Sequence, residues 1–386
     1  MNLFSDEIRR NPYPSYEQMR AQSPVFHVPP PFDGWMVLDY DGVKRVLGDH
    51  RTFSSRVPGP PNWFIFTDPP AHSNLRALIS QAFTPRMIAD LEPRLRELTR
   101  ELLDAVSERG QMDMALDFSV PLAMRAIASI IGIPATDWVQ YRRWSDAVLA
   151  LSATRFGGEA AEQAIRDFHT VTAEMSAYLA VLIEQRRSHP QNDLLTRLIE
   201  AEVDGERLFH EEILGFFQFL VVAGQETTSD LINNSVLCLL ENPDQLGRLR
   251  ADLTLLPSAI EEVLRYRSPT QWFTRIARRA VELQGVEIPR GALVVPVVAA
   301  ANRDPRQFAE PNRFDIARHP NPHIAFGHGI HFCLGAALSR LEARVALSEL
   351  LGRFRSMEMT GEKEWQPREP LQVHGPSSLA VRFEVR

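Results

Sequence analysis

The chain has 386 residues, enough for two or three domains of about 150 residues or for one large hydrophobic core. Acidic residues exceed Lys and Arg by 49 to 42, and the net charge of −7 argues against nucleic acid as the main partner. The two cysteines, Cys238 and Cys333, exclude a disulfide-stapled scaffold, a four-thiolate zinc site and a conventional iron–sulfur cluster. Residues 1–30 lack the apolar core of a signal peptide, so we expect a cytoplasmic protein with no membrane partner.

The hydrophobic pattern predicts a mainly helical chain with small sheets near its two ends. A hairpin is expected where Pro24–Val28 and Trp35–Leu38 alternate around a turn rich in Pro and Gly. The period then becomes helical from about residue 72 to residue 253. Within this region, residues 210–241 are apolar at their centre, and we expect one long helix that is buried nearly all round.

The pattern changes again after a helix predicted over 257–266. Period-two alternation predicts strands at 281–283, 286–288 and 292–298, and a final hairpin is expected over 371–385 around Gly375 and Pro376. A loop-rich stretch over 302–334 leads into a helix over 335–351. With no repeat and no linker, we expect a single helix-rich α+β domain over 1–386.

Cys333 ends a glycine-rich segment, FGHGIHFC, over residues 326–333. The two glycines permit a tight turn, and a helix beginning near Gly335 directs its positive end toward the sulfur, so both features favour a thiolate. A lone thiolate beneath a large apolar helix suits the axial ligand of a haem iron. Two alternatives stay open on the residues alone: an inert buried cysteine, and zinc held by His328, His331 and Cys333.

The segment Ala223-Gly224-Gln225-Glu226-Thr227 lies in the middle of the long apolar helix. A glycine there costs about 1 kcal/mol relative to alanine, and the close approach of a flat cofactor or of O2 would explain it. An acid beside an alcohol can relay protons, which gives Glu226 and Thr227 a catalytic interpretation. The structural alternative is a Thr227 hydroxyl that donates to the carbonyl oxygen of Ala223.

Several cations could clamp two carboxylates, such as those of haem propionates. His72 and Arg76 fall on one face of a helix that follows two prolines, and Arg275 and His331 are further candidates. Taken singly, each of them is more typical of a solvated side chain. Only two of the 42 Lys and Arg residues are lysines, and a guanidinium is the better partner for a carboxylate.

Together these segments resemble the cytochrome P-450 superfamily of haem-thiolate monooxygenases, in its soluble bacterial form, along nearly the whole chain. The haem-binding signature F-x-x-G-x-x-x-C-x-G is matched by Phe326, Gly329, Cys333 and Gly335. The oxygen-activation motif is matched by 223–227. The E-x-x-R pair is matched by Glu262 and Arg265, which on spacing alone would be an ordinary surface ion pair.

The resemblance implies a triangular, helix-rich P-450 fold with haem b between the long helix and the cysteine loop. It implies Cys333 as the axial ligand of the iron and Glu226 with Thr227 as the proton-delivery pair. Glu262 and Arg265 become a structural network completed by Arg313 or Arg318. The remaining cofactor-binding candidates are Ala223, Gly224, Phe326, His72, Arg76, Arg275 and His331.

The chain contains 21 Phe and 6 Tyr, so its aromatic side chains are mostly apolar, which favours a hydrophobic substrate. Two aromatic groups are candidates for the substrate pocket, with the protein core as the alternative location. Trp272 and Phe273 precede Arg275, where relatives often carry smaller aliphatic residues, so these rings either narrow the pocket or point away from it. The pocket candidates are Trp63, Phe64, Phe66, Trp272 and Phe273.

The function expected from the resemblance is hydroxylation of a hydrophobic small molecule such as a fatty acid, a terpenoid or a steroid, with O2 as co-substrate. The chain holds no fused reductase, so electrons from NAD(P)H are expected to arrive through a separate ferredoxin and ferredoxin reductase. An arginine-rich face near the cysteine would attract an acidic partner. Two other classes stay open: a haem-binding sensor or carrier of the same fold without turnover, and a zinc hydrolase.

Overall fold

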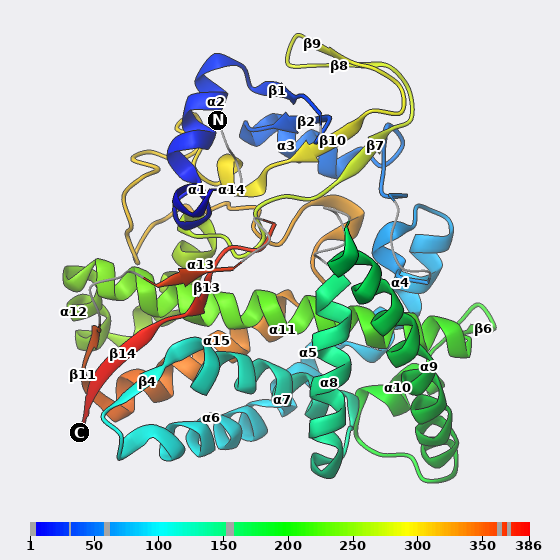
Figure 1. The fold of residues 1–386 in the computed structure, drawn as a ribbon, viewed down its shortest axis with the longest axis vertical. Coiled ribbons are helices and arrows are strands. Elements are labelled where there is room, and N and C mark those ends of the chain that lie inside the picture. The colour runs from blue at the N-terminus through cyan, green and yellow to red at the C-terminus, as the bar shows by residue number, and fades with distance from the viewer. Residues whose placement is uncertain (1–4, 31, 58–61, 152–157, 361–364, 369–371) are drawn as a thin grey trace. The chain divides into compact units, whose positions relative to one another are not determined.

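A computed structural model describes residues 5–30, 32–57, 62–151, 158–360, 365–368 and 372–386, most of them in helices (Figure 1). The α-helices are α1 (Asp6–Arg10), α2 (Tyr13–Gln22), α3 (Tyr40–Gly48), α4 (Ala71–Ala82), α5 (Pro85–Asp90), α6 (Glu92–Ser107), α7 (Val120–Ile131), α8 (Trp138–Leu149), α9 (Glu159–Ser188), α10 (Leu194–Glu200), α11 (His210–Glu241), α12 (Pro243–Ala251), α13 (Leu256–Tyr266), α14 (Val298–Ala301) and α15 (Ala336–Arg353). The strands are β1 (Val25–Val28), β2 (Gly34–Val37), β3 (Phe53–Ser54), β4 (Gln111–Asp113), β5 (Glu202–Val203), β6 (Glu206–Arg207), β7 (Arg275–Ala277), β8 (Val281–Leu283), β9 (Val286–Ile288), β10 (Leu293–Pro296), β11 (Phe354–Met359), β12 (Gln366–Pro367), β13 (Pro376–Ser378) and β14 (Ala380–Val385).

The chain divides into two compact units. Unit 1 contains the sheets near both chain ends together with α12, α13 and α15, and it spans residues 1–57, 99–120 and 227–386. Unit 2 contains α4, α5 and α8–α10 and spans residues 58–98 and 121–226. The long helix α11 contributes its first half to unit 2 and its second half to unit 1. The single-domain organisation over 1–386 stays a prediction.

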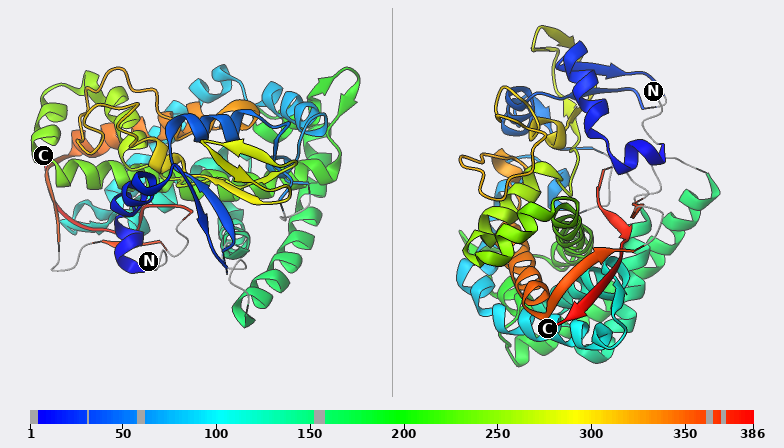
Figure 2. Two further views of the ribbon diagram at one scale, coloured as in Figure 1. Left: turned by 90° about the horizontal axis from the view of Figure 1, so that it is seen from above. Right: turned by 90° about the vertical axis from the view of Figure 1, so that its left-hand side faces the viewer.

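The largest sheet belongs to unit 1 and has the strand order β1-β2-β10-β7-β3. The predicted N-terminal hairpin is confirmed, since β1 and β2 pair antiparallel with Val25 opposite Val37. Strand β10 lies parallel to β2 and antiparallel to β7, which joins segments far apart in the chain (Figure 2). A hydrophobic cluster that includes Val43, Val46 and Leu47 of α3 packs with residues of this sheet.

Other predicted elements are found with small changes of length. The hairpin of β8 and β9 has the predicted bounds, and α13 and α15 match the helices expected over 257–266 and 335–351 to within two residues. The strand expected over 292–298 is shorter, because β10 ends at Pro296 and helix α14 starts at Val298. Proline lacks the N–H that would continue the ladder.

The hairpin predicted over 371–385 is wrong. Strand β13 pairs with β12, and β14 lies between β11 and β4. The residues before Gly375 bond elsewhere: Gln271 N donates to Gln372 O at 2.8 Å, and His374 N donates to Pro269 O at 2.7 Å. A Cβ on Gly375 would lie 2.6 Å from Asp230 of α11, so this turn packs against the long helix instead of closing a local hairpin.

Helix α11 has the predicted bounds, and its burial is close to complete. Between Gly215 and Leu239, every residue is buried except six that cluster within two and a half turns. The six half-buried residues are Phe219, Val222, Ala223, Gly224, Glu226 and Thr227. The helix therefore has one short accessible face, and this face carries the motif that the sequence singled out.

One helical stretch, Met114–Ile131, is long and apolar enough to cross a membrane by length and composition, with a mean hydropathy of 1.5. Since 67% of the stretch is buried within the protein, it has the character of a core helix, and it carries no argument for a membrane.

Candidate active site

The loop before Cys333 is shaped by two glycines in the left-handed region, Gly327 and Gly329, both with φ of +75°. It closes with a hydrogen bond from Cys333 N to Phe326 O at 2.9 Å. Helix α15 begins at Ala336, and a Cβ on Gly335 would lie 4.0 Å from Cys333 Sγ. The half-buried thiol thus lies close to the positive end of an 18-residue helix, as the sequence predicts.

Close contact with α3 explains why Gly329 has no side chain. A Cβ there would lie 2.7 Å from Leu47 O and 3.0 Å from the Cα of Gly48. A Cβ on Gly48 would in turn meet the His328 ring at 3.4 Å. The loop is therefore seated directly on the backbone of α3, which fixes its position within unit 1.

The zinc interpretation of this loop is not supported. Among the described residues, no group of three His, Cys, Asp or Glu side chains is arranged to hold a metal ion. The His331 ring instead contacts Ser55, with 2.9 Å between Nε2 and Oγ. Burial and the nearby Lys44 lower the pKa of His328.

Two of the four propionate candidates lie in unit 1: Arg275 is on β7, and His331 contacts the residue that follows the neighbouring strand β3. Arg275 opens β7, is 7% exposed and donates from Nη1 to Thr274 O at 2.8 Å. Strand β3 pairs with β7, and Ser55, which contacts His331, follows β3 directly. In unit 2, His72 and Arg76 lie one turn apart on α4, which begins after Pro70 as predicted. Their role as propionate contacts stays a prediction.

The acid–alcohol pair lies on the accessible face of α11. Glu226 and Thr227 are half-buried, while Gln225 and Thr228 on either side are 6% and 3% exposed. A helix that is otherwise buried therefore presents an acid and an alcohol at the place where its surface is accessible. The role of Glu226 and Thr227 as a proton relay stays a prediction.

Gly224 has a packing reason that the sequence did not reveal. A Cβ at this position would lie 2.5 Å from Cδ1 and 2.9 Å from Cγ1 of Ile127 on α7. The space that a Cβ of Gly224 would occupy is thus taken by Ile127 of the neighbouring helix α7. The cofactor contacts of Gly224 and Ala223 stay predictions.

A side-chain contact connects the end of this motif to the helix after Cys333. Thr228 Oγ1 and Ser339 Oγ are 3.3 Å apart, and Ser339 lies in the first turn of α15. Both residues belong to unit 1. Within this unit, the residue after Thr227 therefore contacts a helix that starts three residues after the predicted axial ligand.

The pair Glu262 and Arg265 is a buried network and not a surface ion pair. Both side chains are 0% exposed, and Arg265 donates from Nε and Nη2 to the two oxygens of Glu262 at 2.8 Å each. Arg318 completes the network, with Nε 3.1 and 3.2 Å from the same two oxygens. Arg313 contributes only its carbonyl oxygen, and its guanidinium pairs with Glu310 at 2.9 Å.

Trp63 and Phe64 are mainly core residues, at 6% and 3% exposure, whereas Phe66 is half-buried. The Trp63 ring stacks on Phe66 at 6.1 Å and meets Phe219 edge-on at 5.8 Å. Phe64 packs against Phe219 at 5.2 Å and against the His72 ring at 6.0 Å. This aromatic group is thus connected, through Phe219, to the accessible face of α11.

Trp272 and Phe273 point into different surroundings. Trp272 is 7% exposed and lies in a core cluster with Tyr13, Tyr16 and Met36, which matches the core alternative. The half-buried Phe273 has its ring 3.6 Å from the Cβ position of Gly327 in the cysteine loop. Phe273 also packs against the hydrophobic cluster of the unit 1 sheet, and a place in the substrate pocket stays a prediction for both residues.

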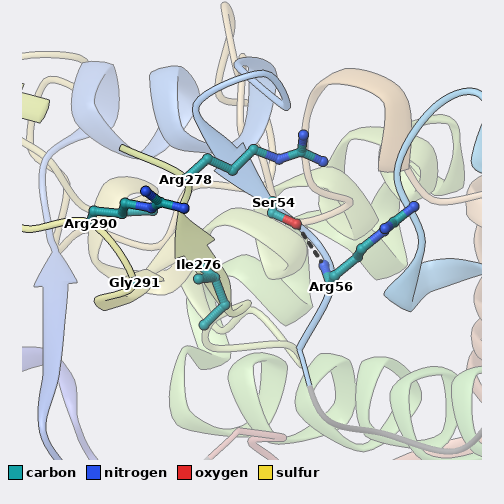
Figure 3. A pocket seen from close by; sticks show the side chains of 7 residues that line it. Ser54, Arg56, Ile276, Arg278, Arg290 and Gly291 are labelled. Carbon is teal, nitrogen blue, oxygen red and sulfur yellow. Dashed lines mark hydrogen bonds between the residues drawn. The ribbon is translucent and has the colours of Figure 1, made fainter. Parts of the chain in front are cut away.

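An open pocket of about 440 Å³ lies on the unit 1 sheet beside β3 and β7. Figure 3 shows the guanidinium groups of Arg56, Arg278 and Arg290 spread around its rim without converging on one point. No predicted site residue lines it, although Ser54 and Ile276 adjoin Ser55 and Arg275. The lining residues are Ser54, Arg56, Ile276, Ala277, Arg278, Arg290 and Gly291.

Comparison with known proteins identifies the family. The family model described as "Cytochrome P450" matches residues 160–381. The cytochrome P450 YjiB of Bacillus subtilis (strain 168) is 42% identical over 382 residues, covering 97% of this chain and 94% of that protein. The cytochrome P450 monooxygenase PikC of Streptomyces venezuelae is 38% identical over 402 residues, covering 99% and 94%.

Among solved structures, that of CYP109E1 from Bacillus megaterium in complex with testosterone matches with a TM-score of 0.89 and 39% identity, covering 96% of this chain and 99% of that chain. The chain therefore belongs to the cytochrome P450 family. It has the family's mainly helical fold with small sheets and is a monooxygenase. The predictions of family, fold class and enzyme class are confirmed.

Cytochrome P450s use haem and O2, and the donor set of this chain fits a haem iron held by one thiolate. Cys238 is 0% exposed, and burial raises the pKa of its thiol to about 12, which keeps it protonated. Cys333 is half-buried at the start of a helix, where a thiolate is favoured. The described residues offer no rival metal cluster.

Three residues near the site were not predicted: Ser55, Ser339 and Ser145, which hydrogen-bonds to Gln225. Each contact joins residues at least 80 positions apart in the chain. A buried serine within an apolar helical face was the only available signal, and it applies to Ser145 alone.

Proposed function

We propose that this monooxygenase hydroxylates a hydrophobic small molecule such as a fatty acid, a terpenoid or a steroid, using electrons from NAD(P)H delivered by a separate ferredoxin and ferredoxin reductase. The observation that carries the proposal is the half-buried Cys333 thiol at the start of α15, with the same helix contacting the residue after Thr227. These contacts support a cofactor ligand and a proton-delivery pair that serve one reaction.

When bound, the haem supplies the activation of O2 and the oxidation of the substrate C–H bond. Cys333 would hold the iron through its thiolate, and α15 would stabilise the negative charge of the sulfur. Glu226 would take up a proton and pass it to the Thr227 hydroxyl, which would donate it at the reaction centre. Their half-burial in an apolar helix supports a limited supply of water, which a controlled proton relay needs.

The cationic candidates would anchor the cofactor. Arg275, placed in β7 and 7% exposed, would pair with a propionate, and His331 would be oriented by Ser55. His72 and Arg76 would contribute from α4. The apolar rings near Phe219 would exclude water from the substrate side.

A hydrophobic substrate is supported by the half-buried aromatic rings Phe66, Phe219 and Phe273. The solved relative CYP109E1 holds testosterone, an apolar ligand of this kind. Shifts in the haem absorption spectrum across a panel of fatty acids, steroids, terpenoids and macrolides would identify the class. A response confined to polar or charged compounds would contradict the proposal.

The ligand assignment is tested by the spectrum of the reduced protein with CO. The wild type should show the strongly red-shifted band of a thiolate-ligated haem, Cys333→Ala should abolish it, and Cys238→Ala should retain it. Loss of the band in the Cys238 variant alone would refute the assignment. Product formation with NADH, ferredoxin and reductase then tests turnover. If the turnover rate did not depend on ionic strength, the prediction that an arginine-rich face attracts an acidic redox partner would be refuted.

A further inference from the structure

Two buried glutamines on α11 are each bonded to a hydroxyl on another helix of unit 2. Gln218 Nε2 donates to Thr172 Oγ1 of α9 at 2.9 Å, and the Ser145 hydroxyl of α8 donates to Gln225 Oε1. Gln218, Gln225 and Ser145 are 3%, 6% and 0% exposed. Seven residues separate the glutamines, so they lie on one face of the helix, and only the second adjoins the acid–alcohol pair.

Two neighbouring helices contact α11 around Gly224. Gly224 makes the backbone locally more adaptable than alanine would. Two neighbouring helices compensate for this: Ile127 of α7 occupies the notch over Gly224, and Ser145 of α8 holds the side chain of Gln225. The next two residues, Glu226 and Thr227, are half-buried.

The contact at Gln225 lies directly before the acid–alcohol pair on the same helix. Residues 225–227 belong to one continuous helix, so a small rotation of α11 at residue 225 turns residues 226 and 227 by a similar angle. Ile127 limits this rotation by steric contact, whereas the hydrogen bond from Ser145 is directional and selects one setting.

We propose that Ser145 is a positioning residue for the monooxygenase reaction, whose hydroxyl fixes the setting of α11 at Gln225 and so orients Glu226 and Thr227. This inference rests on the proposed proton-delivery role of that pair. Without the hydroxyl, Gln225 Oε1 is a buried acceptor that has lost its donor, and such groups draw in water or force a rearrangement. Either outcome disturbs the residues that follow it.

The test compares Ser145→Ala with Thr172→Val in the haem-loaded enzyme. Both variants remove a hydroxyl that bonds a buried glutamine of α11, but Thr172 acts two turns before the acid–alcohol pair. Ser145→Ala should lower the product formed per NADH consumed, and raise the peroxide released, by about fivefold, the ratio equivalent to about 1 kcal/mol for one hydrogen bond. Thr172→Val should leave this ratio within about twofold.

Hydrogen exchange supplies a readout that is independent of turnover. Amides of residues 225–229 should exchange about fivefold faster in Ser145→Ala than in the wild type, and at the wild-type rate in Thr172→Val. The double variant Ser145→Ala with Gln225→Met removes both polar partners, which is close to neutral for stability. It should regain the melting temperature but not the coupling of NADH to product.

Three results would overturn the inference: equal coupling in Ser145→Ala and the wild type, equal loss of coupling in the two single variants, or full recovery of coupling in the double variant. The last result would mean that only an unsatisfied acceptor mattered and not the orientation that the bond sets. The red-shifted band with CO separates the two proposals. Its absence from the wild type refutes the haem-thiolate function, whereas its presence with unchanged coupling in Ser145→Ala refutes the positioning role alone.

Discussion

The buried network around Glu262 makes a sharp prediction about stability. Replacing Arg265 by Met removes a side chain that is 0% exposed and leaves Glu262 with Arg318 as its remaining cation. It also deprives three carbonyl oxygens of a donor. The bonds lost run from Arg265 to both oxygens of Glu262 and to the carbonyl oxygens of Asn302, Pro311 and Arg313.

Breaking a buried pair by removing one partner costs about 3–5 kcal/mol. A typical domain has about 5–15 kcal/mol of total stability, so Arg265→Met should lose a large share of it. Arg318 is 12% exposed and makes longer bonds to Glu262, at 3.1 and 3.2 Å, so Arg318→Met should lose about 1–3 kcal/mol. Arg313, 56% exposed, provides the control, and Arg313→Met should stay within about 0.5 kcal/mol of the wild type.

The assay is urea unfolding of the three variants at one pH, with the haem content of each measured beforehand. The order of loss should be Arg265→Met, then Arg318→Met, then Arg313→Met, with similar dependence of the unfolding free energy on urea. A loss below about 1 kcal/mol for Arg265→Met, or one equal to that of Arg313→Met, would refute the assignment of a buried network.

Three further predictions concern single residues. Burial raises the pKa of Asp230 to about 6, although Arg368 donates to both its oxygens. Because the folded protein then holds this proton more tightly than the unfolded chain, the stability of the wild type should fall relative to Asp230→Asn as the pH rises from about 4 to about 6. Urea midpoints of the two proteins that change in parallel across this window would contradict the prediction. Gly329→Ala should lower the melting temperature more than Gly285→Ala. Both glycines have positive φ, but of the two only Gly329 would place a Cβ 2.7 Å from a backbone atom. Equal decreases in melting temperature would show that this close contact does not explain the glycine at 329. Gly224→Ala should lower the free energy of unfolding, because the new Cβ would meet Ile127. Gly247→Ala, in a helix with nothing within 4 Å of the Cβ position, should raise it by about 0.5–1 kcal/mol. If urea unfolding showed a higher free energy of unfolding for both variants, the packing explanation of Gly224 would be refuted.

The sequence was informative where structure depends on local pattern. The bounds of α11 follow from a long apolar segment that ends before a proline, and both are visible in the chain. The hairpin of β8 and β9 follows from alternation around Gly285, whose φ is +79°. The family motifs are likewise short segments. These features need no knowledge of distant neighbours.

Prediction failed where a distant segment determines the outcome. The C-terminal hairpin looked plausible around Gly375, but Pro269 and Gln271, about 100 residues earlier, bond the segment before it. An i,i+3 pair of opposite charge looks the same in a sequence whether it is exposed or buried, so spacing alone did not separate the Glu262 network from a surface pair. The reason for Gly224 is a methyl group of Ile127, and no local pattern contains it.

The polar residues of α11 explain how one long apolar helix is held in a single register. Apolar packing alone selects the setting of a helix less sharply, because contacts between apolar side chains are non-directional. Buried polar groups select it more sharply, since each must keep its partner. Gln218 and Gln225 bond to hydroxyls of α9 and α8, Thr228 contacts Ser339, and Asn234 donates to the carbonyl oxygens of Arg267 and His374 at 3.1 and 2.8 Å. Because these contacts bracket Glu226 and Thr227 on both sides, the need of each buried polar group to keep its partner holds this part of α11 in one setting, which is what the proposed proton-delivery role of the pair requires.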